Sequence, residues 1–220
     1  MPGIIQATTT LAPVPLVPEI RIHQASEPIS LWLDTEQATG RSGLDPPFWA
    51  FAWAGGRALA RYLLDHPEVV RGRRTVDIAS GSGLVAIAAA VAGAATVVAY
   101  DIDPLAEAAI TLNARANDVL VDAVCADVLT DEREAAAEAD LVLVADAFYE
   151  RELAGSVSRF LEHARSRGAS ILAGDFGRTY LPRDRLVALA SYDVPDLRVL
   201  EGSDIKRTTV WTMRGTSLVL

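Results

Sequence analysis

The sequence predicts an α/β fold, a doubly wound and mostly parallel sheet of seven strands with a small N-terminal extension. Two observations carry this prediction. From residue 75 onward, short apolar runs rich in β-branched residues alternate with helix-forming segments, the pattern of parallel strands joined by crossover helices. Near the C-terminus two strand-like runs follow one another with no helix between them, so we expect an antiparallel pair that closes the sheet.

Length and composition limit the class of protein. The 220 residues suffice for one domain, which we expect to span residues 19–220, with residues 1–18 disordered. The net charge of -9 argues against nucleic acid as a partner, and no apolar run reaches the roughly 18 residues of a membrane span. A single cysteine, Cys125, excludes an internal disulfide and fits a reducing cytoplasm. We expect a cytoplasmic monomer with no metal site.

The stretch from Thr75 to Asp103 forms the centre of the predicted domain. Its expected elements are a strand at 75–79, a turn at 80–83, a helix at 84–91 and a strand at 96–100. Gly81 and Gly83 let a ligand approach the backbone because neither has a Cβ atom. Free N–H groups at the start of the helix favour a negative group such as a carboxylate. Asp101, about 20 residues beyond the glycines, is placed to accept both hydroxyls of a ribose.

The residues around the turn indicate which ligand fits. The Gly-x-Gly-x-x-Gly pattern of dinucleotide sites is absent, since the chain reads Asp77-Ile-Ala79-Ser-Gly-Ser-Gly83. Asp77 at the strand end suits a ligand with an ammonium group and suits a pyrophosphate poorly. A packing loop in some other α/β domain stays an alternative for this loop taken alone.

Two later strands also end on an acid. The run at 120–126 precedes Asp127, and the continuously apolar run at 140–145 precedes Asp146. Together with Asp101 they place acids at the carboxyl ends of parallel strands, where open α/β sheets bind ligands. Asp127 is able to accept an adenine amine or to serve only as a loop acid. Cys125, within the same strand, is expected to be a small buried residue.

An aromatic segment precedes the central unit. Residues 46–56 read PPFWAFAWAGG, and a helix is expected from Arg57 to Asp65. A loop that places Trp49 or Trp53 over the crevice would exclude water and contact a cation. Capping of the sheet by the same aromatic side chains is the alternative and stays open at this point.

The remaining elements follow from periodicity and from turn residues. Expected strands lie at 19–24, 29–34, 169–174, 194–200 and 207–213. Expected helices lie at 104–117, 131–139, 152–166 and 183–190.

These residues resemble the class I methyltransferases, whose seven-stranded Rossmann-like domain binds S-adenosylmethionine (SAM). The glycine loop, the strand-end acids and the C-terminal strand pair carry the resemblance, and Asp146-Ala-Phe-Tyr149 is similar to the Asp-x-x-Tyr motif of protein methyltransferases in this class. PPFWAFAWAGG, RYLLDHPEVVRGRR, SGSGLVAIAAA, DIDP and GDFGRTYLP resemble the lysine methyltransferases of the electron transfer flavoprotein β subunit. The likeness runs from about Asp45 to Trp211, and Ala54 and Ala79 stand where that family has proline and glycine.

The resemblance implies a role for each candidate residue. The implied cofactor site consists of Trp53, Asp77, Ala79, Gly81, Gly83, Asp101, Ile102 and Asp127, with the ribose on Asp101 and the adenine on Asp127. The implied catalytic residues are Asp146, which would orient the acceptor amine, and Tyr149, which would line its path. The implied substrate contacts are Trp49, Phe148, Asp175 and Arg178, and the implied partner is the flavoprotein β subunit.

The implied reaction is an in-line displacement of the SAM methyl group by a neutral lysine nitrogen. Deprotonating a free lysine at pH 7 costs roughly 4–5 kcal/mol, because its pKa is about 10.4. Burial beside a sulfonium would lower that pKa. Three alternatives remain: a small-molecule N-methyltransferase of the same fold, a SAM-binding protein without catalysis and, disfavoured by the acid-rich crevice, a nicotinamide-dependent oxidoreductase.

Overall fold

The computed structural model describes residues 2–26, 31–32, 36, 46–130, 139–195 and 205–216. Within this part of the chain, a seven-stranded sheet has the order β5-β4-β3-β6-β7-β9-β8. Its parallel strands are β3 (Arg74–Ile78), β4 (Thr96–Asp101), β5 (Asp122–Cys125), β6 (Leu141–Ala145) and β7 (Ser170–Asp175). The antiparallel pair is β8 (Leu186–Pro195) and β9 (Ile205–Met213), and β9 pairs with β7. The doubly wound, mostly parallel sheet is confirmed.

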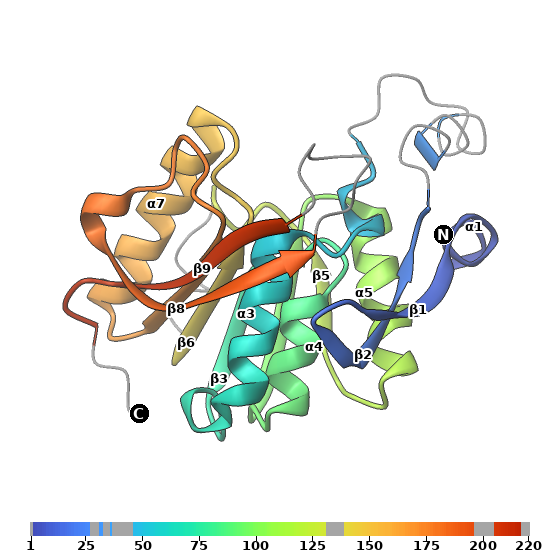
Figure 1. Cartoon of the computed structure of the whole chain (residues 1–220), viewed down its shortest axis with the longest axis horizontal. Coiled ribbons are helices and arrows are strands. Elements are labelled where there is room, and N and C mark those ends of the chain that lie inside the picture. Colours follow the sequence, from blue (N-terminus) through green and yellow to red (C-terminus); the bar gives the residue numbers. More distant parts are fainter. Residues whose placement is uncertain are drawn as a thin grey trace.

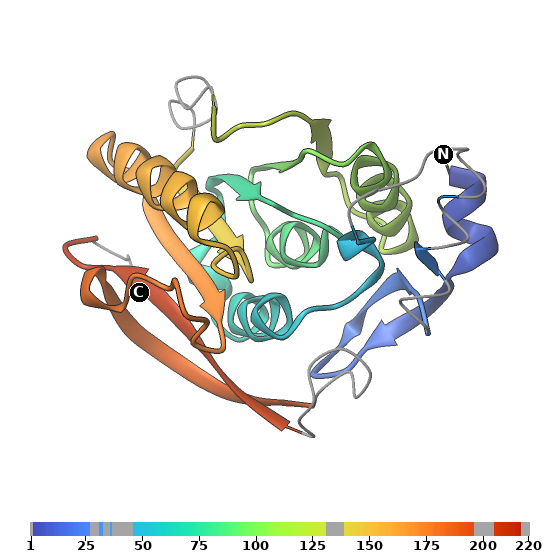
Figure 2. The same cartoon turned by 90° about the horizontal axis from the view of Figure 1, so that it is seen from above.

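Helices cover both faces of the sheet (Figure 2). One face carries α3 (Ala54–Asp65), α4 (Leu84–Val91) and α5 (Pro104–Ala116), and the other carries α7 (Arg151–Ser166). The central strand β6 shows why its sequence is continuously apolar. Leu141 and Leu143 pack with α3 and α4, whereas Val142 and Val144 pack with α7. Alternate side chains of a strand point to opposite faces, so both sets are buried.

The strand order reverses between β3 and β6. The chain moves outward from β3 through β4 to β5, then returns to the other side of β3 as β6 and β7. All five parallel strands end at the same edge of the sheet. Ligands of doubly wound proteins bind beyond this edge where the order reverses, so the strand-end acids lie at the expected place.

The N-terminal segment is ordered, which differs from the disorder expected for residues 1–18. Helix α1 (Pro2–Thr8) and the antiparallel hairpin of β1 (Thr10–Val14) and β2 (Val17–Gln24) lie beside α5 (Figure 1). Val14 and Val17 are fully buried in the main core. This tertiary packing orders the segment, although its proline-rich composition had indicated disorder. The fully buried side chain of Asn113 links this hairpin to the glycine loop: its Oδ1 accepts the His23 N–H at 2.8 Å, and its Nδ2 donates to the Ser82 carbonyl at 2.8 Å.

The C-terminal segment contains a second difference. The helix expected at 183–190 is only a short 3-10 turn, η3 (Arg183–Arg185), after which the chain continues as β8. Strand pairing from Leu186↔Met213 to Pro195↔Ile205 explains this, since the long ladder overrides a locally helix-forming composition. Of the strand expected at 194–200, only the first two residues lie in β8, and the rest fall outside the described residues.

Most other boundaries agree with the expected ones within one to three residues. The expected helix at 131–139 lies outside the described residues except for its last residue. Of the expected strand at 29–34, the described residues Leu31 and Trp32 are helical.

Candidate active site

A glycine loop joins β3 to α4 at the carboxyl edge. Gly81 and Gly83 have φ of 55° and 79°, in the left-handed region that favours glycine. A Cβ atom on Gly83 would lie 3.1 Å from Cγ1 of Ile110 in α5, so packing also requires glycine there. At Gly81 the nearest neighbours of such an atom belong to the aromatic segment, the Phe48 carbonyl oxygen at 3.8 Å and the Trp49 Cα at 3.9 Å. The aromatic segment therefore lies over the glycine loop.

Ala79, the last residue before this loop, has φ of 51°. A residue with a Cβ atom is strained in this region by roughly 1–2 kcal/mol. The implied family pattern has glycine at this position, and the backbone geometry explains why. The methyl group is exposed, so the alanine is accommodated without a clash inside the core.

Asp77 lies at the end of β3 with its side chain buried. The Ser80 hydroxyl donates a hydrogen bond to its Oδ2 at 2.5 Å. Burial, with a smaller contribution from the nearby Asp101 carboxylate, raises the pKa of this carboxyl to about 7, against the opposing effects of the Ser80 hydrogen bond and of a backbone hydrogen bond from Ala86. Among the described residues no ion pair joins a cation to Asp77, so a ligand ammonium would stabilise its ionised form.

Asp101 ends the neighbouring strand and reaches back to the glycine loop. Its Oδ2 accepts the Gly81 N–H at 2.8 Å and its Oδ1 accepts the Asp103 N–H at 3.0 Å. Burial raises the pKa of this carboxyl above its ordinary value. Each oxygen keeps acceptor capacity beyond the single N–H it receives, which a pair of ribose hydroxyls would use. Ile102, 67% exposed, presents an apolar surface beside it.

Asp127, two residues beyond β5, is exposed at the same edge. Its Oδ1 accepts the Leu129 N–H at 3.0 Å, the local contact of a loop acid. The second carboxylate oxygen is able to accept a hydrogen bond from an adenine amine. The structure therefore agrees with Asp127 either as a loop acid or as an adenine contact. Together these groups fit SAM: the buried Asp77 carboxylate for an ammonium, the partly buried Asp101 carboxylate for a ribose, and the glycine loop at the start of α4 for a carboxylate.

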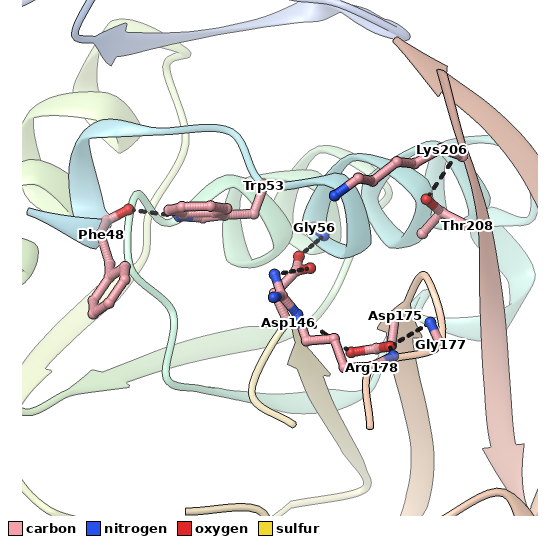
Figure 3. Close-up of polar contacts among 9 residues, drawn as sticks. All are labelled: Phe48, Trp53, Gly56, Asp146, Asp175, Gly177, Arg178, Lys206 and Thr208. Carbon is pink, nitrogen blue, oxygen red and sulfur yellow. Dashed lines mark hydrogen bonds and ion pairs between the residues drawn. The ribbon is translucent and has the colours of Figure 1, made fainter. Parts of the chain in front are cut away.

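A second group of residues lies at the ends of β6 and β7 (Figure 3). Asp146 has φ of 56° and is 8% exposed. Its Oδ2 accepts the Gly56 N–H of the first turn of α3 at 2.9 Å, and its Oδ1 lies 3.3 Å from Nη2 of Arg178. A backbone hydrogen bond from its N–H to the Gly174 carbonyl at 3.0 Å fixes the position further. The Asp146 carboxylate is thus fixed by backbone and side-chain hydrogen bonds and is paired with the Arg178 guanidinium.

Arg178 is positioned by Asp175. The buried Asp175 carboxylate accepts the backbone N–H groups of Gly177 at 2.6 Å and of Arg178 at 2.7 Å. Its Oδ2 lies 3.8 Å from Nε of Arg178, and burial raises the pKa of this carboxyl above its ordinary value. The guanidinium carbon of Arg178 lies 4.5 Å from the ring centroid of Phe176 and 6.0 Å from that of Tyr149. The cation therefore lies among aromatic rings and carboxylates.

Aromatic rings form the rim of this group. Phe48 is 39% exposed and Tyr149 is 45% exposed, and their ring centroids lie 5.7 Å apart. The Trp53 ring lies 5.9 Å from Phe48, and its Nε1 donates to the Phe48 carbonyl at 2.9 Å (Figure 3). Tyr149 and Trp53 thus both contact Phe48 and lie with it beside the carboxyl edge of the sheet.

Other candidate residues occupy different places than expected. Trp49 is 1% exposed and packs with Ile5 of α1 and Leu105 of α5, so it lies neither over the glycine loop as an exposed wall nor against the strands of the sheet. Phe148 is fully buried in the core beneath α7, and Asp175 is fully buried and orients Arg178. Direct contact of these side chains with a substrate would require the structure to open. Cys125, expected to be buried, is exposed because it lies on the sheet's edge strand β5.

Sequence reasoning missed the contributions of Phe48, Phe176 and the glycine pair at 55–56. A Cβ atom on Gly55 would collide with the Gly174 carbonyl, and it would lie 2.6 Å from Oδ2 of Asp146. The double glycine before a helix was the available signal, since it permits a close backbone approach. The ring contacts of Phe48 and Phe176 depend on tertiary packing and left no sequence signal.

The described residues contain neither a metal site nor a membrane-spanning helix. No group of three or more His, Cys, Asp or Glu side chains there is arranged to hold a metal ion. Among the same residues, every helix is too short or too polar to cross a membrane.

Comparisons with known proteins agree with this geometry. The family model of ribosomal protein L11 methyltransferase (PrmA) matches residues 59–174. The electron transfer flavoprotein beta subunit lysine methyltransferase of Rattus norvegicus is 34% identical over 204 residues, which cover 89% of this chain and 77% of the relative. The protein of the same name from Homo sapiens is 35% identical over 209 residues, which cover 89% of this chain and 75% of the relative.

Solved structures support the fold. A ribosomal protein L11 methylase from Lactobacillus delbrueckii subsp. bulgaricus has a TM-score of 0.52 at 17% identity, covering 74% of this chain and 80% of that chain. The magnesium protoporphyrin IX methyltransferase of Synechocystis PCC 6803, solved with bound SAM, has a TM-score of 0.52 at 13% identity, covering 72% and 77%.

The sheet order, the glycine loop and the strand-end acids define a class I methyltransferase, the class of α/β enzymes that use SAM as methyl donor. Within this class, the chain belongs to the family of electron transfer flavoprotein beta subunit lysine methyltransferases.

Proposed function

We propose that the protein transfers methyl groups from SAM to lysine side chains of the electron transfer flavoprotein β subunit. One observation carries the proposal beyond family membership. The Asp146 carboxylate, at the reversal point of the strand order, is bordered by aromatic rings and by the Arg178 guanidinium. This surrounding suits a long side chain that ends in an amine.

The proposed cofactor place is the β3–β4 half of the edge. Bound there, SAM supplies an electrophilic methyl group on a sulfonium. Asp77 would hold the ammonium end and Asp101 the ribose hydroxyls, with Ile102 and Asp127 toward the adenine. The aromatic segment lies over the glycine loop and would exclude water from the reacting atoms.

The proposed acceptor place is the β6–β7 half. Asp146 would accept a hydrogen bond from the acceptor nitrogen and so orient its lone pair. Arg178 has a complementary effect, because a neighbouring cation disfavours a second positive charge and lowers the pKa of the incoming amine. Tyr149 and Phe48 would contact the methylene chain of the acceptor. The neutral, oriented amine is the nucleophile that the reaction needs.

The experiment incubates the purified protein with labelled SAM and a soluble lysate, with and without added electron transfer flavoprotein. Mass spectrometry of the labelled product then identifies the acceptor. We expect label on lysine residues of the β subunit and labelling roughly 100- to 1,000-fold slower with Asp146→Asn, while Asp122→Asn, on the exposed surface of β5, serves as the matched control. Label on a small molecule alone would overturn the proposed substrate, and SAM binding without any transfer would favour a non-catalytic role. The cytoplasmic location and the monomeric state stay predictions.

A further inference from the structure

Lys206 is the single lysine of the chain, among 20 basic residues. It is the second residue of β9, which runs antiparallel to β7 with Asp175 opposite Thr209. Because β7 ends at Asp175, the residues of β9 that precede Thr209 extend beyond the carboxyl edge of the parallel strands. The only lysine thus lies on the side of the sheet where the candidate active site is.

The period of β9 directs this side chain toward α3. Lys206, Thr208 and Val210 share one face of the strand, and Val210 is buried in the core cluster that includes α3. Arg207, the next residue, points to the opposite face and is exposed. A hydrogen bond from the Thr208 hydroxyl to the Lys206 carbonyl at 3.2 Å fixes the local backbone.

The Lys206 amine and the Arg178 guanidinium contact the same aromatic ring, that of Phe176. Its Nζ lies 4.1 Å from the ring centroid of Phe176, and the Arg178 guanidinium carbon lies 4.5 Å from that centroid. Nη2 of Arg178 in turn lies 3.3 Å from Asp146. Figure 3 shows the Lys206 side chain extended inward, toward the group formed by Trp53, Gly56 and Asp146.

We propose that Lys206 is a methyl acceptor within its own chain. The inference rests on the proposed function, because it assigns a second acceptor to the same site. The surroundings of Lys206 are those proposed above for an acceptor lysine of a partner protein: an aromatic ring beside the amine, the Arg178 guanidinium on the same ring, and the Asp146 carboxylate paired with that guanidinium. Lys206 reaches them as a side chain of β9, so no binding step precedes its approach.

The Lys206 ammonium first loses a proton to water, which leaves a lone pair on Nζ. That lone pair forms a nitrogen–carbon bond with the SAM methyl group while the carbon–sulfur bond breaks and its electron pair stays on sulfur. S-adenosylhomocysteine is released, and the monomethylated nitrogen carries the positive charge.

The first test is the intact mass of the purified protein before and after incubation with SAM, followed by peptide mapping. We expect a gain of whole methyl groups located at Lys206, and no gain in Lys206→Arg. The matched control is the double variant Lys206→Arg with Arg207→Lys, which keeps the charge and the number of lysines but moves the amine to the opposite face of β9. An unchanged wild-type mass, or equal methylation of the control at position 207, overturns the inference.

The second test does not depend on turnover. Protein grown with lysine labelled with carbon-13 at the ε position gives a single lysine signal, because the chain has one lysine. Addition of S-adenosylhomocysteine should shift this signal in the wild type and leave it unshifted in the matched control. An unshifted wild-type signal at saturating S-adenosylhomocysteine contradicts the inference, since an acceptor nitrogen must approach the transferred carbon to about 3–3.5 Å.

Including flavoprotein in the mass experiment distinguishes the failure of one proposal from the failure of the other. Methylated β subunit with unmodified Lys206 overturns the internal acceptor and keeps the proposed function. Methylated Lys206 with unmodified β subunit keeps the internal acceptor and overturns the proposed substrate.

Discussion

The carboxylates in the two halves of the carboxyl edge of the sheet have different partners. Asp77 and Asp101, on the β3–β4 side, accept hydrogen bonds from a hydroxyl and from backbone N–H groups, and burial raises the pKa of both. No ion pair with a cation reaches either of them among the described residues. Asp146, on the β6–β7 side, faces the Arg178 guanidinium at 3.3 Å. The first half suits a ligand that brings its own positive charge, whereas the second half already contains one.

Under the proposed function, this difference would separate the place of the cofactor from the place of the acceptor. A carboxylate removed from water with no cation beside it is costly in its ionised form, so the first half gains most from binding a cationic ligand. A carboxylate that is already paired gains little from a second cation and favours a neutral amine instead. If the proposal holds, the positively charged cofactor binds on one side and the nucleophile on the other, and substitutions on the two sides should have different kinetic consequences.

The largest expected effect belongs to Asp146→Asn. The amide keeps the volume but loses the charge that holds Arg178 and orients the acceptor, so kcat should fall roughly 100- to 1,000-fold. Affinity for S-adenosylhomocysteine, measured by calorimetry, should stay within about threefold, a factor worth about 0.6 kcal/mol. Comparable losses in cofactor affinity and in kcat would show that the two halves are not functionally separate.

Asp101→Asn should have the converse effect. It weakens charge-assisted hydrogen bonds to the ribose hydroxyls, each worth about 1.5–3 kcal/mol, so the cofactor Kd should rise roughly 10- to 100-fold. The value of kcat at saturating SAM should change little. Asp122→Asn, an exposed acid on β5, is the control for loss of one negative charge. A large drop in kcat with unchanged Kd would contradict the assignment of Asp101 to the cofactor.

The ionisation of Asp77 should make both the free energy of unfolding and the affinity for the cofactor depend on pH. In the folded protein the Asp77 carboxyl keeps its proton up to a pKa of about 7, while in the unfolded chain it releases the proton near its ordinary pKa of 3.8. Without cofactor, this carboxyl therefore lowers the free energy of unfolding as the pH rises through that window. A ligand ammonium favours the ionised form of Asp77. Below pH 7, affinity for S-adenosylhomocysteine should therefore increase by up to about tenfold for each unit by which the pH rises.

Calorimetric titrations between about pH 5.5 and 7 measure this slope, in a range where carboxylates with unperturbed pKa values are already ionised. In Asp77→Asn the slope should shrink, and the remainder would belong to Asp101, whose pKa burial also raises. An equal slope in the variant and in the wild type would remove Asp77 from ammonium binding.

Much of the first half of the edge follows from sequence, and less of the second. The strands, the glycine loop and the three strand-end acids depend on local pattern, so their placement was predictable. Trp49 and Phe148 look like substrate walls in sequence, yet tertiary packing buries both. The β8 strand was missed because pairing with β9 overrides its helix-forming composition. The approach of Lys206 to Phe176 joins segments 30 residues apart and left no local signal.

The smallest expected effect concerns the connection between β3 and the glycine loop. Ala79 has a φ of 51°, where the Cβ atom is strained, so Ala79→Gly relieves strain in the folded state while making the unfolded chain more flexible. We expect a net gain of about 0.5–1 kcal/mol in the free energy of unfolding, measured by urea denaturation. Ala108→Gly, inside helix α5, is the matched control and should destabilise by about 1 kcal/mol because its backbone is helical. If both variants lose stability alike, the left-handed conformation at position 79 is not a source of strain, and the alanine there would need an explanation based on the cofactor instead.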